Sequence, residues 1–126
     1  TMPLANARPI AFIVTRDRKV SEAFYGQTLG LRRLPGDDFA AVFDLDGIPL
    51  RVTEVPGHVA SAHPVLGWQV ADIVATVQAL ANRGVVMTIY PGLGQDALGI
   101  WTSPDGAAKV AFFADPDGNG LSLTQA

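Results

Sequence analysis

The sequence contains no cysteine, few basic residues and no long apolar run. The lack of cysteine excludes disulfides, thiol catalysis and zinc–thiolate sites, and it agrees with a cytoplasmic location. No stretch is apolar over the roughly 20 residues that a membrane-spanning helix needs, so we expect no membrane partner. Nine Lys and Arg against twelve Asp and Glu give a net charge of −3. This balance disfavours nucleic acid as the main partner, because phosphate binding needs a basic face.

The composition that remains is that of a globular protein. Hydrophobic residues make up 48% of the 126 residues and charged residues 17%. A chain of this length can bury a core of its own, so we predict a single domain over residues 1–126.

The first half of the chain predicts one helix among several strands. Residues 9–15 are apolar and β-branched, which is typical of a strand. Asp17 can cap a helix that ends at Gly30, with Val20, Ala23 and Phe24 facing the core. Further strands are expected at 31–35, 38–44 and 48–55.

The second half repeats this order. A strand at 64–70 precedes a helix that Asp72 caps and Gly84 ends, with Ile73, Val77 and Leu80 on one stripe. A strand is then expected at 85–91. The segment around Trp101 and residues 107–114 flank a Pro-Asp-Gly turn, and the last strand is expected at 120–124.

Two similar segments, 71 positions apart, read VFDLDGIPLRVTE and FADPDGNGLSLTQ. Each copy has an Asp-x-Asp-Gly turn followed by a strand. We therefore predict two βαβββ modules, 9–55 and 64–125, joined by a linker at 56–63. The fold class is α+β, with the helices outside the sheets and a cleft between the modules. The alternative, a ferredoxin-like sandwich, is disfavoured by the three strands after each helix.

These residues resemble the vicinal oxygen chelate superfamily, which includes glyoxalase I, extradiol dioxygenases and bleomycin resistance proteins. The resemblance rests on AFYGQTLGL (23–31), QVADIVATVQAL (69–80) and FFADPDGNGLSL (112–123). It covers nearly the whole chain and implies a glyoxalase-like cleft and a homodimer. It implies the reaction less strongly, because this fold carries many functions.

Enzymes of this superfamily hold a divalent metal with His and Glu side chains at four positions. The matching positions here are Ile10, Arg51, Val65 and Ser122. Ile and Val offer no lone pair, and Arg51 places a positive charge where the superfamily has a negative one. We therefore expect no metal and no other cofactor at these positions.

Side-chain alternation indicates which residues would line the cleft instead. The side chain of Trp68 is expected to point to the other face of its strand, away from the cleft and into the core. Arg51 is either an anchor for an anionic or carbonyl group, or a partner of Asp46, Glu54 or an acid across a dimer. For residues 108–114, alternation does not determine which side chains point into the cleft, because a bulge would move each of them to the other face of the strand. The expected ligand-binding residues are Phe12, Arg51, Thr53, Gln69, Tyr90, Trp101 and Ser122.

No obvious catalytic base is found among the candidates. His58 and His63 lie in the linker at a spacing that is not typical of metal ligands, and Glu22 and Glu54 are expected away from the cleft. We therefore expect a metal-free protein that binds a small organic ligand. The alternative is a metal-independent lyase or isomerase of the glyoxalase-like superfamily, and a third possibility is a scaffold whose own side chains fill the cleft.

Overall fold

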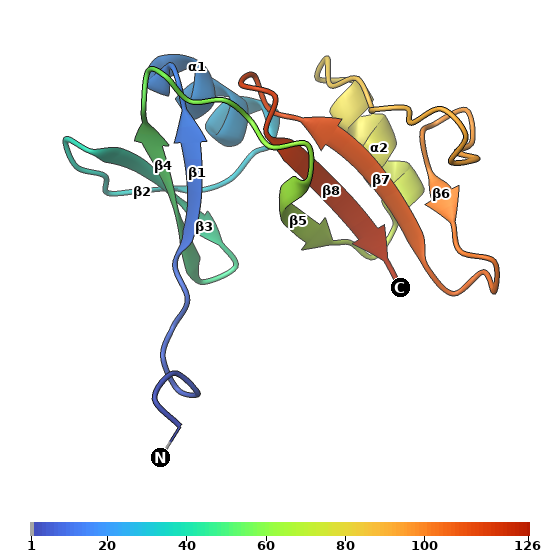
Figure 1. Cartoon of the computed structure of the whole chain (residues 1–126), viewed down its shortest axis with the longest axis horizontal. Helices are drawn as coiled ribbons and strands as arrows, with labels where there is room; N and C mark the ends of the chain where they lie inside the picture. Colours follow the sequence, from blue (N-terminus) through green and yellow to red (C-terminus); the bar gives the residue numbers. More distant parts are fainter. Residues whose placement is uncertain (1) are drawn as a thin grey trace. The chain divides into compact units, whose positions relative to one another are not determined.

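A computed structural model describes residues 2–126 of the chain (Figure 1). The chain forms two compact units, one ending at His58 and the other beginning at Val59. The division falls inside the segment 56–63 that the sequence predicts as a linker. Each unit is described by itself below.

The first unit is a four-stranded sheet with one helical segment. The strands lie in the order β1-β4-β3-β2, with β1 parallel to β4 and the other pairs antiparallel. The elements along the chain are β1 (Ala11–Thr15), α1 (Arg18–Ala23), the π-helical turn η1 (Phe24–Thr28), β2 (Arg33–Leu34), β3 (Ala40–Leu45) and β4 (Ile48–Glu54).

The helical segment begins where the sequence predicts but presents a different face. The Asp17 carboxylate accepts hydrogen bonds from the amides of Lys19 and Val20, which caps α1. The buried side chains are Ser21 and Tyr25, whereas Val20 and Ala23 are exposed, so the predicted face is wrong. A hydroxyl can face the sheet here because Ser21 donates to the Thr15 hydroxyl over 2.8 Å.

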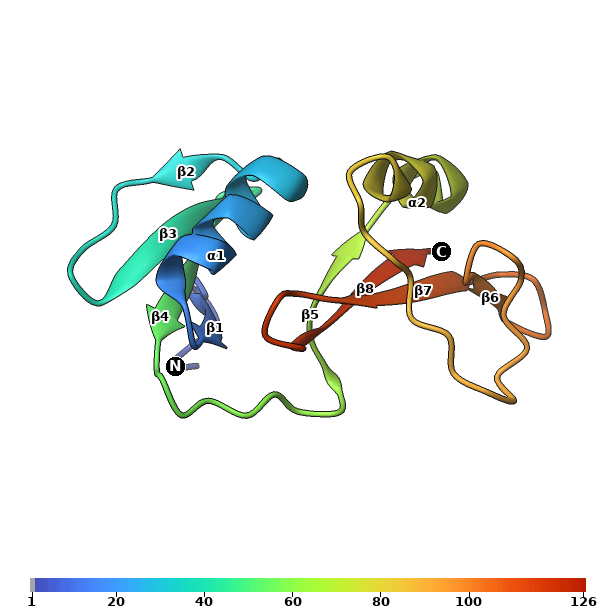
Figure 2. The ribbon, with the colours of Figure 1, turned by 90° about the horizontal axis from the view of Figure 1, so that it is seen from above.

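The helical segment covers one face of the first sheet (Figure 2). The ring of Tyr25 lies 6.1 Å from the ring of Phe43, and Phe43 is the register partner of Leu50. Leu50, Val52 and Phe43 are fully buried on this face. The core of the unit therefore lies between the helix and the middle strands β3 and β4, as alternation along these strands predicts.

The second unit repeats the arrangement. Its strands lie in the order β5-β8-β7-β6, again with one parallel and two antiparallel pairs. Its helix α2 covers one face of the sheet (Figure 2). The elements along the chain are β5 (Pro64–Gln69), α2 (Ile73–Ala81), β6 (Trp101–Thr102), β7 (Lys109–Ala114) and β8 (Gly120–Gln125).

The prediction for α2 is confirmed in detail. Asp72 caps the helix by accepting from the amide of Ala75 over 3.0 Å. Ile73, Val77 and Leu80 are its buried residues. This stripe has the 3.6-residue spacing of a helix with one face on a core.

The strand expected at residues 85–91 is not formed. This segment runs beside β7 with a hydrogen bond from the Thr88 amide to the Phe112 carbonyl, but it is irregular. It continues into a loop in which Gly92, Gly94 and Gly99 have positive φ, which breaks an extended ladder. The short strand β6 takes the edge position on β7 instead.

The fold class predicted from the sequence is confirmed. Each unit has the order strand, helix and three strands, and the helices lie outside the two mixed sheets. Among residues 2–126, neither α-helix has the length and apolar character needed to cross a bilayer.

Candidate functional site

The first sheet has a second face, opposite α1, that carries the predicted candidates of this unit. We call it the open face of the first sheet. Register places Phe12 beside Arg51, and Thr53 beside Val14 and Ala40. Phe12 and Ile10 are 63% and 52% exposed, so this face presents apolar side chains to its surroundings. Its strand residues are Phe12, Val14, Leu34, Ala40, Val42, Asp44, Pro49, Arg51 and Thr53.

Arg51 lies on β4, one of the two middle strands, and is held by a single carboxylate. Its Nη2 donates to Oδ2 of Asp37 over 2.9 Å. The other oxygen of Asp37 accepts from the backbone amides of Phe39 and Ala40, both at 2.9 Å. The side chain of Arg18 also donates to the backbone carbonyl of Asp37, which further fixes the loop between β2 and β3. Asp37 is therefore fixed by its own loop and holds Arg51 in place.

These contacts lower the pKa of Asp37. The hydrogen bond from Arg51 is the main cause, and the amides of Phe39 and Ala40 add to it. All three contacts favour the charged carboxylate. A lowered pKa in the folded state means that this contribution to stability is complete above the usual titration range of Asp. It is lost only as the pH falls through the lowered pKa, so the Asp37 carboxylate is ionised at neutral pH.

Asp37 is not among the partners that the sequence suggests for Arg51. Glu54 instead accepts from the backbone amide of Arg18. Within residues 2–126, the pair with Asp37 is the one polar interaction of the Arg51 side chain. A guanidinium has several further N–H donors, so Nε and Nη1 of Arg51 can each bind an acceptor.

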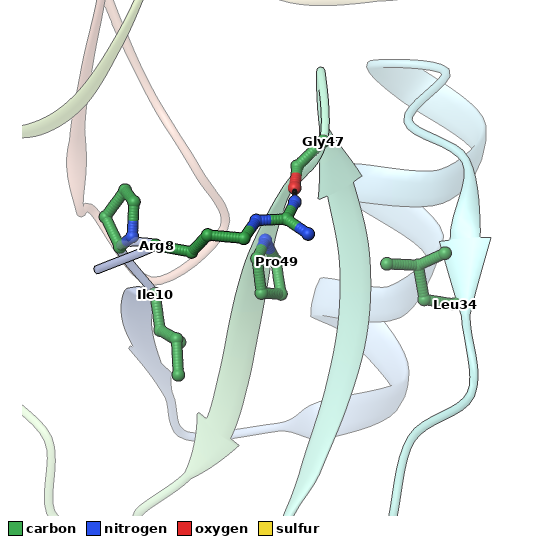
Figure 3. A pocket seen from close by; sticks show the side chains of 6 residues that line it. Arg8, Ile10, Leu34, Gly47 and Pro49 are labelled. Carbon is green, nitrogen blue, oxygen red and sulfur yellow. Dashed lines mark hydrogen bonds between the residues drawn. The ribbon is translucent and has the colours of Figure 1, made fainter. Parts of the chain in front are cut away.

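A pocket of about 370 Å³ lies on the same unit. It is lined by Arg8, Pro9, Ile10, Leu34, Gly47 and Pro49 (Figure 3). The Arg8 side chain donates to the Gly47 carbonyl (Figure 3). Pro49 is two residues before Arg51 on β4, so the pocket and Arg51 lie on one face of the sheet.

The structure places the four positions at which the resemblance implies metal ligands. Ile10 lines the pocket just before β1, and Arg51 holds Asp37. Val65 lies at an irregularity in the pairing of β5 with β8, and Gly67 is the register partner of Ser122. Among residues 2–126, no group of three or more His, Asp or Glu side chains is placed to hold a metal ion.

The second sheet also has a face opposite its helix, with the other four predicted candidates. Gln69 lies beside Thr124, and Ser122 lies between Gly67 and Phe112. Trp101 is the register partner of Val110. The Tyr90 ring meets the Phe112 ring edge to face, with centroids 5.3 Å apart.

The structure thus groups Phe12, Arg51 and Thr53 in the first unit and Gln69, Tyr90, Trp101 and Ser122 in the second. Trp68 points to the helix side, where it stacks on Phe113 with centroids 6.3 Å apart. Trp68 is thus half-buried on the core side, as alternation predicts.

Several site residues are not predicted from the sequence, among them Phe112, Arg8 and Asp37. Phe112 belongs to the stretch whose parity alternation left open, and its pairing with Ser122 places it on the face opposite α2. Arg8 is two residues before Ile10, so the same alternation extended by one step would have found it. Asp37 lies 14 positions from Arg51 in an irregular loop, and no local pattern indicates that contact.

Comparison with known proteins supports the fold. No protein-family model and no curated protein matches the sequence. Solved structures do match over nearly the full length of both chains. A glyoxalase family protein from Enterococcus faecalis has 18% identity and a TM-score of 0.74, covering 98% of this chain and 99% of that chain.

Two further structures agree with it. A member of the glyoxalase/bleomycin resistance protein/dioxygenase superfamily from Sphaerobacter thermophilus has 20% identity and a TM-score of 0.74, covering 98% and 99% of the two chains. The fosfomycin resistance protein FosX from Listeria monocytogenes has 12% identity and a TM-score of 0.75, covering 96% and 93%. The resemblance to the vicinal oxygen chelate superfamily is therefore confirmed at the level of the fold.

Proposed function

We propose that this protein binds a small organic molecule on the open face of the first sheet, without the superfamily metal, and that Arg51 donates to a carbonyl or anionic group of that ligand. The observation that carries the proposal is Arg51 itself. A fixed cation stands at a metal-ligand position, with free N–H donors and exposed apolar neighbours.

The chemistry of the four positions supports a metal-free site. Ile10 and Val65 have no donor atom, and Ser122 has only a neutral hydroxyl. A cation 4 Å from a dication would be repelled by about 2 kcal/mol in water, and by more where water is excluded. Arg51 therefore favours a ligand with electron-rich oxygen atoms over a metal ion.

The neighbouring apolar surface supports an organic ligand. The pocket beside Arg51 has a volume near the lower end of the roughly 300–1,000 Å³ that is typical of small-molecule sites. Its walls are mainly apolar, with Pro9, Ile10, Leu34 and Pro49. Two of the structural neighbours are named for bleomycin or fosfomycin resistance. Their names agree with a role in binding a small molecule. The ligand class proposed for this protein is inferred from its own side chains.

Two further expectations belong to this proposal. The resemblance to the superfamily implies a homodimer. The absence of cysteine agrees with function in the cytoplasm. The expected ligand-binding residues of the second unit, Gln69, Tyr90, Trp101 and Ser122, are proposed to contact a small molecule on the face of their own sheet opposite α2.

Replacing Arg51 by glutamine should weaken ligand binding about tenfold, because one charge-assisted hydrogen bond is lost. The measurement is a thermal-shift screen with small carboxylic acids and ketones, since a ligand of the native state must raise the melting temperature. The hit is then titrated against wild type and the Arg51→Gln variant.

Arg83→Gln is the matched control, because it removes the same charge in the second unit, beyond α2. Equal affinity of the Arg51→Gln variant and wild type would contradict the proposal. NMR spectra of the ligand before and after long incubation separate binding from turnover. A binding protein returns the ligand unchanged, whereas the alternative lyase or isomerase converts it.

A further inference from the structure

Among the described residues 2–126, Arg8 is the cation of the open face that no carboxylate neutralises. Its side chain is exposed and lines the pocket, and its one hydrogen bond goes to the uncharged carbonyl of Gly47. Among residues 2–126, no Asp or Glu side chain forms an ion pair with it. Asp44 lies in the turn that contains Gly47, and it pairs with Arg32 over 3.5 Å.

Arg51 stands in a different electrostatic environment. It contacts the ionised carboxylate of Asp37 over 2.9 Å, so its charge is largely compensated at neutral pH. An anion brought to Arg51 would also approach Asp37 and be repelled by it. An uncharged carbonyl would not meet this repulsion, and it could still accept from Nε or Nη1.

The pocket beside Arg8 combines this free charge with an apolar wall. Pro9, Ile10, Leu34 and Pro49 supply the wall, and the Arg8 side chain lines the same pocket (Figure 3). A carboxylate on a compact apolar body fits both features. The acid group can take the N–H donors that Arg8 does not use on Gly47, while the body displaces water from the wall.

We propose that the pocket lined by Arg8, Ile10, Leu34 and Pro49 binds the carboxylate end of a small organic acid, with Arg8 as the anion anchor. Arg51 then takes an uncharged carbonyl or other neutral acceptor of the same ligand. This inference rests on the proposed function, since it assigns the two polar ends of a ligand on the open face of the first sheet. It names the ligand class as a small carboxylic acid with an apolar body.

The test compares an acid with its amide of the same shape. ¹⁵N-labelled protein is titrated with 3-phenylpropionate and with 3-phenylpropionamide, and shifts of the Ile10, Leu34 and Gly47 amides report on the pocket. Wild type should prefer the acid about tenfold, which is the contribution of one charge-assisted hydrogen bond. In the Arg8→Gln variant this preference should vanish, with the affinity for the amide unchanged.

Two other variants make the outcome specific. Lys19→Gln removes a positive charge on α1, on the opposite side of the sheet, and should keep the full preference for the acid. Arg51→Gln should keep it too, although its affinity for a carbonyl ligand falls. All three positions have exposed or partly exposed side chains, so the variants should fold.

The results separate this inference from the proposed function. Loss of the acid preference in Arg51→Gln, with Arg8→Gln unaffected, would overturn the role of Arg8 and leave the Arg51 site standing. Equal affinity of wild type for acid and amide would also overturn it. An absence of shifts on the open face with both compounds, together with no hit in the thermal-shift screen, would overturn both proposals.

Discussion

Replacing Phe43 by alanine should lower the free energy of unfolding of the first unit by about 3–5 kcal/mol. Phe43 is fully buried on β3 beneath the helical segment. Its ring lies 6.1 Å from that of Tyr25 and 5.3 Å from the Arg33 guanidinium. A methyl group in its place would leave a cavity that neighbouring side chains fill only in part, which is the reason for the large effect.

Phe39→Ala is the matched control for this change. Phe39 is the residue before β3 and is 76% exposed, so the same truncation should alter stability by less than about 0.5 kcal/mol. Urea unfolding followed by circular dichroism measures both. Comparable losses for the two variants would show that the core of this unit is not where the structure places it.

The second large effect is expected at Asp115, in the second copy of the repeated turn. Asp115 is 5% exposed, and its Oδ1 accepts from the amides of Asp117 and Asn119, both at 2.9 Å. Its Oδ2 accepts from the buried side-chain amide of Asn119 over 2.8 Å. Asp115→Ala should cost about 2–4 kcal/mol, because it leaves buried donors without an acceptor.

The first copy of the turn provides the comparison. Asp44 accepts from the Gly47 amide over 2.8 Å and forms a long, partly exposed pair with Arg32. Asp44→Ala should therefore cost only about 1 kcal/mol. Trp68 and Trp101 both lie in the second unit, so tryptophan fluorescence reports on the Asp115 variant and circular dichroism on both. Equal losses for the two variants would contradict the difference in burial between the turns.

The two copies of the repeated segment thus have the same structural role but carry different side chains at one position of the sheet face. Both copies form a hairpin turn that leads into a middle strand, β4 or β8. The residue that follows the shared leucine points to the face opposite the helix, and there the copies differ as Arg51 and Ser122. The repetition builds the sheets, and the difference gives the first sheet its charged site.

Local patterns in the sequence were sufficient for most of the fold. The stripe on α2 was predictable because an Asp cap and three apolar residues at helical spacing agree with each other. The face of α1 was not, because the pattern favours Val20 over the hydroxyl of Ser21. Only the contact between Ser21 and Thr15 makes that burial favourable. The segment 85–91 has strand-like residues, yet Gln95 binds Thr88, Tyr90 and Gly99 and holds this part of the chain in a loop.

The candidate site was predictable in part, for a related reason. Alternation placed Phe12, Arg51 and Thr53 on one face because a strand fixes side-chain direction without reference to the rest of the chain. The ion pair of Arg51 with Asp37 depends on how an irregular loop folds back over the sheet, which requires the three-dimensional structure. A role of Arg8 as an anion anchor could not be predicted from the sequence, because it depends on the pocket that Arg8 lines in the folded protein.

An organic ligand, and not a metal ion, is proposed to occupy the open face of the first sheet. Native mass spectrometry of protein purified without added metal or chelator tests this proposal most directly. We expect a mass equal to the polypeptide plus a small organic adduct, and we expect the adduct to be lost in the Arg51→Gln variant. A stoichiometric metal adduct in the wild-type protein would contradict it, because Ile10, Arg51, Val65 and Ser122 would then have been wrongly excluded as a metal site.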